Sequence, residues 1–407
     1  MADIPKIRFK GFTEPWEQRK LGEVLKERTE RAKGDEELLS VTIANGVIRQ
    51  IDSEKRNTAS EDRSNYKIVK KGDVPYNSMR MWQGAVGNSK YNGIVSPAYT
   101  ILTPTSEANG KFFMELFKKK STLQIFQRWS QGLTSDTWNL KYPILSSIQF
   151  AIPSVEEQEK IAEYFSSLDY LITLHQRKCD DTKELKKYML QKMFPKNGEK
   201  FPEIRFKGFT EAWEQRKLED FGKATGGTSI ESEFSEDGVY KVISIGSYSE
   251  NSVYNDQGIR AIKSDKTSNR VLNRNDLTMI LNDKTTSGNI IGRVLLIEES
   301  GIYVYNQRTE RIEINLDEYD PVFLYEMLNA PNIREKIIKQ AQGNTQIYVN
   351  WTTISLLEYM IPSKEEQVKI GEHLYGISNL IALHQRKCDT LKELKKYMLQ
   401  NMFPKKG

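Results

Sequence analysis

The amino-acid sequence predicts an α+β protein of two similar halves, each a strand-rich domain followed by one long helix. Three observations lead to this prediction: an internal repeat, short β-prone runs broken by turn signals, and apolar residues spaced alternately four and three positions apart. The chain has 407 residues, more than one domain usually holds, and 38% of them are hydrophobic. That share is sufficient for ordinary globular cores.

Composition narrows the class of protein. No stretch approaches the ~18 consecutive apolar residues of a membrane span, the mean hydropathy is −0.61, and the first residues lack the apolar core of a secretory signal. Only Cys179 and Cys388 occur, too few for a disulfide scaffold. We therefore expect a soluble cytoplasmic protein with no membrane contact. The net charge is +5, but residues 219–383 are acidic, so charge alone does not indicate a nucleic-acid partner.

Two blocks of sequence occur twice. Residues 5–21 (PKIRFKGFTEPWEQRKL) return at 202–218 with 15 of 17 positions identical, and residues 171–191 return at 380–400 with 18 of 21 identical. The segments between these blocks share little sequence. If the two copies had diverged uniformly after a duplication, sequence identity would be lowered to a similar extent at all positions. We therefore interpret the constant blocks as performing one shared task and the variable segments as performing two different ones.

The two variable segments predict the same order of elements. A run–turn–run pattern surrounds Gly72-Asp73 in the first segment and Asn275-Asp276 in the second, which is typical of paired strands. The elements that follow are strands at 93–102 and 301–314, single helices at 112–129 and 321–341, and polar loops at 130–139 and 342–351.

Each half ends in a helix of some 38 residues, roughly 57 Å long at 1.5 Å per residue. Ser154 and Ser363 each precede a Glu by three positions, the spacing of a capping box, and Phe-Pro ends each helix. The four–three spacing is that of a coiled coil, so we expect the two apolar stripes to pair; packing against an outside helical partner is the alternative. The stripes are Ile161, Phe165, Leu168, Ile172, His175, Cys179, Thr182, Leu185, Met189 and Met193, and Ile370, Leu374, Ile377, Ile381, His384, Cys388, Leu391, Leu394, Met398 and Met402.

The usual catalytic motifs are absent from the sequence. We find no Walker-type phosphate loop, no GxGxxG motif after a strand and no Ser–His–Asp arrangement. His175 with Cys179, and His384 with Cys388, have a spacing that suits tetrahedral zinc. Both pairs lie on the apolar stripes, where a buried thiol acts as a small hydrophobe. We expect no catalytic, cofactor-binding or metal-binding residue in this chain, and a zinc-stapled helical adaptor stays an alternative.

Polar loops in the variable segments are candidates for contacts with nucleic acid. Arg, Asn and Gln make bidentate contacts with base edges, whereas Ser, Thr and Lys hold phosphates. The candidates in the first two loops are Asn77, Ser78, Arg80, Trp82 and Gln83, and Asn282, Lys284, Thr285, Thr286 and Asn289.

As a whole, the pattern resembles the specificity subunit of type I restriction–modification enzymes. The motifs that carry the resemblance are the paired WEQRKL blocks, the G-D and N-D turns, the VSPAY and YNQR runs, the QG-T loops and the IPS–EEQ helix starts. These runs and loops, with their flanks, add the DNA-contact candidates Lys90, Tyr99, Thr134, Ser135, Gln307, Arg308, Asn344 and Thr345.

The resemblance implies two target recognition domains, related by a pseudo-two-fold axis, that each read one half of a split DNA target. It also implies an antiparallel coiled coil that holds the domains apart and docks two methyltransferase subunits. Those partners bind S-adenosylmethionine, and separate restriction or motor subunits use ATP and Mg. The chain itself is then a non-catalytic subunit. The implied divisions are a constant segment 1–22, recognition domain 23–151, spacer helix 152–195, linker and repeated segment 196–218, recognition domain 219–360, and spacer helix 361–407.

Two other classes of protein remain open. One is an enzyme with its own chemistry, and the other is a protein-docking scaffold that reads no DNA. The repeat makes one further geometric prediction. Gly198 and Pro202 are four residues apart in the sequence, so they lie within about 15 Å of each other. Their repeat counterparts are Gly407 and Pro5, and a two-fold relation between the halves would give these two residues the same separation.

Overall fold

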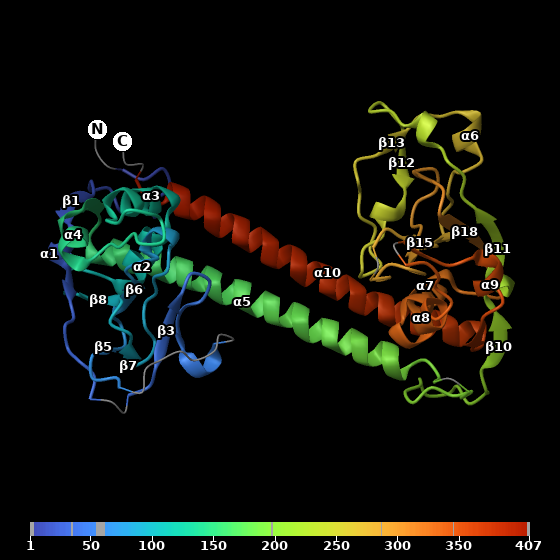
Figure 1. Ribbon diagram of the computed structural model, residues 1–407, viewed down its shortest axis with the longest axis horizontal. Helices are drawn as coiled ribbons and strands as arrows, with labels where there is room; N and C mark the ends of the chain where they lie inside the picture. Colours follow the sequence, from blue (N-terminus) through green and yellow to red (C-terminus); the bar gives the residue numbers. More distant parts are fainter. Residues whose placement is uncertain are drawn as a thin grey trace. The chain divides into compact units, whose positions relative to one another are not determined.

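The computed structural model describes residues 4–33, 36–53, 62–196, 198–285, 287–344 and 346–404 (Figure 1). The chain forms two compact units: unit 1 comprises residues 1–176 and 385–407, and unit 2 comprises residues 177–384. Each unit combines one strand-rich domain with part of both long helices, which confirms the α+β prediction. Within the described ranges, no helix has the length and apolar character needed to cross a membrane.

Unit 1 contains four small sheets, of order β1-β9, β2-β8-β6, β3-β4 and β5-β7, and every pair of strands is antiparallel. The strands are β1 Glu17–Lys20, β2 Leu25–Glu27, β3 Leu39–Thr42, β4 Gly46–Arg49, β5 Lys67–Val69, β6 Val74–Asn77, β7 Gly93–Val95, β8 Tyr99–Pro104 and β9 Gln149–Ile152. The helices are α1 Leu21–Val24, α2 Gly110–Lys118, α3 Lys120–Trp129, α4 Tyr142–Ser147 and the first part of α5 Val155–Lys192, with 3-10 turns η1 Gln50–Asp52 and η2 Met81–Gln83.

Unit 2 contains sheets of order β10-β20, β11-β18-β14-β16, β13-β12-β17 and β15-β19, of which only the β12-β17 pair is parallel in the described residues. The strands are β10 Glu214–Lys217, β11 Gly222–Gly226, β12 Tyr240–Ile243, β13 Arg260–Ala261, β14 Leu277–Ile280, β15 Asn282–Asp283, β16 Val294–Leu296, β17 Tyr303–Tyr305, β18 Thr309–Ile314, β19 Ile347–Tyr348 and β20 Glu358–Ile361. The helices are α6 Asp265–Ser268, α7 Pro321–Asn329, α8 Pro331–Ile338, α9 Trp351–Ile354 and α10 Lys364–Asn401, with 3-10 turns η3 Leu218–Phe221, η4 Glu231–Glu233 and η5 Ile245–Ser247.

The two long helices run antiparallel within each unit. In unit 1 the Cys388 thiol lies 3.9 Å from the Ile172 carbonyl oxygen, and Lys395 reaches back to Asp169 with bonds of 2.8 Å. In unit 2 the Cys179 thiol lies 3.8 Å from the Ile381 carbonyl oxygen. Both cysteines are buried and free. The pairing of α5 with α10 is therefore confirmed inside each unit.

The predicted stripe is wrong at one repeated position. Leu185 and Leu394 are exposed, at 45% and 38%, and their neighbours Lys186 and Lys395 point inward instead. A straight helix has 3.6 residues per turn, so a strict seven-residue pattern drifts around its surface along four heptads. Each inward lysine meets a buried glutamate of α7 or α2: Lys186 Nζ lies 2.7 Å from Glu326, and Lys395 Nζ lies 3.2 Å from Glu115.

The start of each long helix differs from a capping box. The Ser154 hydroxyl accepts a bond from the Glu157 backbone N–H at 3.4 Å, but the Glu157 carboxylate does not return to residue 154. It accepts two bonds of 2.7 Å from the guanidinium of Arg8, in the constant N-terminal block, and is 1% exposed. Arg205 and Glu366 form the same pair in unit 2. A bidentate ion pair therefore joins residues 5–21 to the start of α5, and residues 202–218 to the start of α10.

The Phe-Pro helix ends are parts of the cores. Phe403 is 1% exposed, and its ring lies 6.1 Å from that of Trp16 and 5.4 Å from that of Phe112 on α2. In unit 2, Phe194 lies 6.4 Å from Trp213 and 5.8 Å from Phe323 on α7. Each strand-rich domain thus encloses the end of one long helix within its main apolar cluster.

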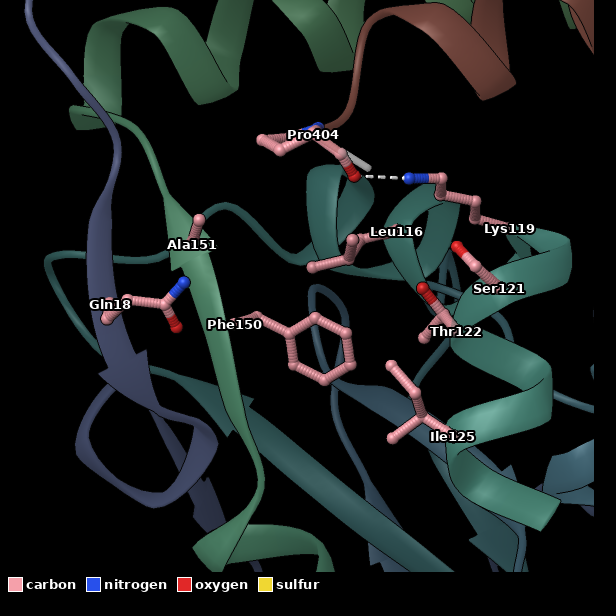
Figure 2. A pocket seen from close by; sticks show the side chains of 9 residues that line it. All are labelled: Gln18, Leu116, Lys119, Ser121, Thr122, Ile125, Phe150, Ala151 and Pro404. Atoms are coloured by element: carbon pink, nitrogen blue, oxygen red, sulfur yellow. Dashed lines mark hydrogen bonds between the residues drawn. The ribbon is translucent and has the colours of Figure 1, made fainter. Parts of the chain in front are cut away.

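The single helix predicted after the strands is two helices in each unit. Both breaks have the same backbone angles, φ −63° and ψ 135°, at Lys119 and Ala330. Pro331 accounts for the break after Ala330, because proline disfavours helical angles in the preceding residue. At the other break, Lys119 Nζ donates a 2.6 Å bond to the Pro404 carbonyl beyond α10 (Figure 2). The cavity beside this bond, about 30 Å³, has room for a water or two.

The first and the last described segments of the chain are in contact in unit 1. The Ile7 N–H donates a 3.0 Å bond to the Asn401 carbonyl, and the repeat-related bond, from the Ile204 N–H to the Lys192 carbonyl, measures 2.9 Å in unit 2. Gly407, used in the prediction of closure, lies outside the described residues.

We predict that Lys395→Ala destabilises unit 1 by about 3–5 kcal/mol, because it leaves the Glu115 carboxylate buried without its cation. The matched control is Lys396→Ala, which removes a lysine whose side chain is 67% exposed and should cost less than about 1 kcal/mol. Urea unfolding of both variants measures the difference, and equal losses would contradict the role of the buried network.

Candidate nucleic-acid interface

Three chain segments meet at one end of β6 and β8 in unit 1. The Ser78 N–H donates to the Ala98 carbonyl at 3.3 Å, and the Ser78 carbonyl accepts from the Leu140 N–H at 2.9 Å. Leu140 follows a hairpin that is closed by two bonds between Gln131 and Asn139, of 3.0 and 2.8 Å. The turn after β6, the turn before β8 and the 131–139 hairpin therefore form one junction.

Unit 2 builds the same junction from different residues. The Leu281 N–H donates to the Arg308 carbonyl at 2.9 Å, and the Leu281 carbonyl accepts from the Val349 N–H at 2.9 Å. Gln342 and Tyr348 close the matching hairpin with bonds of 2.9 and 3.0 Å. All of these bonds join backbone groups, so the junction tolerates different side chains in the two units.

The first junction exposes some predicted residues and buries others. Arg80, Thr134 and Ser135 are exposed, whereas Asn77, Trp82, Gln83 and Tyr99 are half-buried. Arg80 contacts the Gln83 amide at 3.3 Å, at the start of η2, which Gly84 closes with φ +89°. Trp82 packs edge-on against Trp138, with 5.2 Å between ring centroids, and donates to the Met79 carbonyl at 3.1 Å.

Two predicted residues of unit 1 do not face the junction. Ser78 is 5% exposed, and its hydroxyl lies 2.8 Å from the Thr100 hydroxyl inside the domain. Lys90 is exposed but follows Ser89, which exchanges backbone bonds with Gly72 and Asp73 at the opposite end of β6. Four residues of strand, roughly 13 Å, separate that turn from the junction.

In unit 2, Lys284, Thr285, Asn289, Arg308 and Asn344 are exposed, and Asn282 and Gln307 are half-buried. Thr286 and Thr345 lie outside the described residues.

Several of the polar groups in unit 2 already have acidic partners. Asn289 donates to Glu250 at 2.8 Å, Gln307 donates to Glu231 at 2.9 Å, and the Thr285 hydroxyl donates to Asp283 at 2.8 Å. Arg308 differs, because its guanidinium has no hydrogen bond or ion pair among the described residues. Its backbone has φ +71°, an uncommon angle for a residue other than glycine.

Sequence reasoning missed residues that lie at or beside these junctions. Met79, Trp129 and Leu133 are exposed at 40%, 49% and 101%, but apolar side chains are not an expected signal for DNA contact. In unit 2, Glu310 is 6% exposed opposite Gly226 on β11, and burial raises the pKa of its carboxyl to about 7. Neither unit contains, in its described residues, a group of three or more His, Cys, Asp or Glu side chains that could hold a metal ion.

The repeated architecture matches a known family. The family model described as type I restriction modification DNA specificity domain matches residues 13–183 and again residues 210–393. The chain belongs to that family. The specificity domain therefore occurs twice, as the internal repeat and the two junctions indicate, and the resemblance found in the sequence is confirmed.

Individual relatives agree with this assignment. The chain is 26% identical over 345 residues to the type I restriction enzyme MjaVIII specificity subunit of Methanocaldococcus jannaschii, covering 82% of this chain and 78% of that protein. Its fold is similar to that of the type I restriction–modification S subunit from M. genitalium, with TM-score 0.65, 14% identity and coverage of 99% and 100%. A chain from a structural study of assembly in the type I R-M system has TM-score 0.51, 16% identity and coverage of 97% and 99%.

We predict that Ser78→Ala lowers the stability of the first specificity domain by about 1–3 kcal/mol, because the buried Thr100 hydroxyl loses its partner. The same change should leave the ranking of DNA sequences unaltered. The control is Ser135→Ala at the exposed hairpin, expected within about 0.5 kcal/mol of the parent. Thermal unfolding and competition binding report the two properties, and altered sequence ranking in Ser78→Ala would assign that residue to the interface after all.

Proposed function

We propose that this chain is the DNA-reading subunit of a type I restriction–modification enzyme and that each specificity domain reads one half of a bipartite target. One observation carries the proposal. Both units build the same backbone junction and present different exposed side chains on it. A split target requires two readers that share a scaffold and differ in surface.

The exposed groups suit double-stranded DNA. Arg80 and Arg308 are the base readers in this proposal, because a guanidinium makes paired bonds with guanine O6 and N7. Asn77, Gln83, Asn282, Gln307 and Asn344 have amides suited to adenine. The hydroxyls and amines of Tyr99, Thr134, Ser135, Lys284 and Thr285 are suited to phosphate. Ser78 is left out because it is buried, and Lys90 because it lies at the other end of β6.

The long helices provide the docking surface for partner subunits. Among the repeated residues, Leu185 and Tyr188 of α5 and their counterparts Leu394 and Tyr397 of α10 are large side chains that are exposed by 38% to 57%. Identical apolar residues that stay exposed in both copies fit two copies of one partner. We propose the methyltransferase subunits as these partners, and restriction or motor subunits join through that complex.

The chemistry of the enzyme lies in those partners in this proposal: S-adenosylmethionine binds the methyltransferase, and ATP and Mg bind the motor. This chain contributes recognition and spacing. A scaffold without DNA readout is the second candidate function, and the exposed arginines at both junctions weigh against it.

We expect that exchanging residues 23–150 for the matching segment of another specificity subunit changes one half of the methylated sequence and leaves the other half intact. The reason is that each junction is built from its own unit: Ser78, Ala98 and Leu140 in unit 1, and Leu281, Arg308 and Val349 in unit 2. Sequencing of methylated adenines in a host that expresses the exchanged chain measures the outcome. A change in both halves would contradict modular reading, and no change at all would favour the scaffold.

We expect Tyr188→Ala and Tyr397→Ala each to weaken binding of one methyltransferase subunit by about 30-fold, the loss of some 2 kcal/mol typical of a central interface aromatic. The double variant should lose both subunits. Tyr170→Ala is the matched control: Tyr170 is 67% exposed on α5, but its repeat counterpart is Asn379, so it belongs to no duplicated surface. Native mass spectrometry gives the stoichiometry; two bound subunits in the double variant would place docking elsewhere.

A further inference from the structure

The hairpin of the first junction carries an apolar tip. Leu133 is 101% exposed, and Trp129, at the end of the helix that leads into the hairpin, is 49% exposed. Single exposed apolar residues are common on proteins. Here, however, Met79 on the facing turn is also 40% exposed, so the apolar surface extends across two segments of the junction.

The hairpin presents this tip on an ordered support. The Thr137 and Trp138 N–H groups donate to the Thr134 carbonyl at 3.0 and 3.1 Å, and the Thr134 N–H donates to the Thr137 hydroxyl at 3.1 Å. Gly132 has φ +151°, and a Cβ atom there would lie 2.6 Å from the Thr137 carbonyl oxygen. Trp138 fixes the base of the hairpin against Trp82. Leu133 is therefore held away from the domain, and no packing contact within the domain accounts for a leucine at this place.

The segments that form the first junction carry unpaired cations. Arg80, Arg128 and Lys141 are exposed, and none of them has an ion pair among the described residues, whereas Asp136 is the one carboxylate in residues 119–142. Exposed apolar and cationic side chains on the same segments complement a ligand that is anionic outside and apolar inside. Duplex DNA, with phosphates around a base stack, has that arrangement. A groove on a partner protein would also bind exposed apolar side chains, but it would not explain why the cations are unpaired.

We propose that Leu133 inserts between two stacked base pairs of the half-site read by the first specificity domain and kinks the duplex there, while Arg80, Arg128 and Lys141 hold the flanking phosphates. This inference rests on the proposed function. Leucine is among the side chains that proteins use as wedges, and such wedges kink DNA by roughly 20–90°.

The second domain provides an internal contrast. At the position that corresponds to Leu133 its hairpin carries Asn344, which is exposed and polar and does not form an apolar wedge, and the exposed Tyr348 (37%) lies at the closed base of the hairpin. The two halves of the target are therefore treated differently: the first half-site is kinked and read in part through its deformability, and the second is read without a wedge.

The test uses the complex of this chain with its methyltransferase subunits and duplexes that contain the target identified by methylation sequencing. Fluorescent dyes at the two ends report bending by energy transfer. Leu133→Ala should abolish most of the bend and lower affinity for the intact duplex by about tenfold. A mismatch at the inserted step should restore the affinity, because the step is then already unstacked. Leu133→Met keeps an apolar wedge and should retain the bend.

Leu316→Ala is the matched control and should leave the bend unchanged, because Leu316 is 50% exposed but lies beyond the end of β18 that is remote from the second junction. An unaltered bend and affinity in Leu133→Ala, with sequence-specific binding intact, would overturn the wedge and leave the proposed function standing. Failure of the parent complex to prefer its target over other DNA would overturn the proposed function itself. Loss of methyltransferase binding by Leu133→Ala without DNA, seen by sedimentation, would make the tip a protein-docking site and also overturn the wedge.

Discussion

The structure of each unit depends on one contact: its strand-rich domain packs around the end of a long helix that lies outside the domain in the sequence. In unit 1 the core around Trp16 and α2 closes on Phe403, which follows α10, and in unit 2 the corresponding core closes on Phe194. About two turns earlier, Lys395 and Lys186 form ion pairs with buried glutamates of the same domains. The core of each strand-rich domain includes side chains at the end of a long helix, outside the domain's own stretch of sequence. The helices and the domains therefore fold together.

This requirement explains why some blocks of the sequence are nearly identical in both copies. Arg8 pairs with Glu157, the Ile7 N–H bonds to the Asn401 carbonyl, and the same contacts recur at the positions related by the repeat. Residues bound to one another in this way cannot change singly, because a lost partner leaves a buried charge or polar group unpaired. Packing does not explain the duplicated residues Tyr188 and Tyr397, because both are exposed on the long helices. The proposed docking of two copies of one partner gives these two residues a shared role.

The parts of the fold governed by local periodicity could be predicted from the sequence. Both long helices have the expected 38 residues, and the run–turn–run pattern around Asp73 forms two strands. Around Asp276 the prediction is right only for the second run, β14, because the first run forms one isolated bridge, between Val271 and Val304, and no strand. The errors occur where a distant residue decides the outcome. Glu157 turns to Arg8 instead of capping its own helix, and Lys395 replaces Leu394 at the helix interface because a glutamate of α2 faces it. At the site, the sequence indicated which loops meet. It did not indicate that the Ser78 hydroxyl bonds to Thr100 or that Leu133 is exposed, because neither property depends on the local sequence pattern.

The same separation between backbone and side chain explains how one scaffold carries two surfaces. Each junction is held by the N–H and carbonyl of a single central residue, Ser78 or Leu281, and those groups are present whatever the side chain is. The hydroxyl of Ser78 bonds inward, whereas Met79, which follows it, is exposed. Substitutions at the exposed positions therefore alter charge, hydrogen-bonding groups and apolar surface without loosening the junction. Because the cores close on Phe403 and Phe194 at a distance from these loops in the sequence, the surface that distinguishes the two domains is free to vary while the helix ends stay fixed.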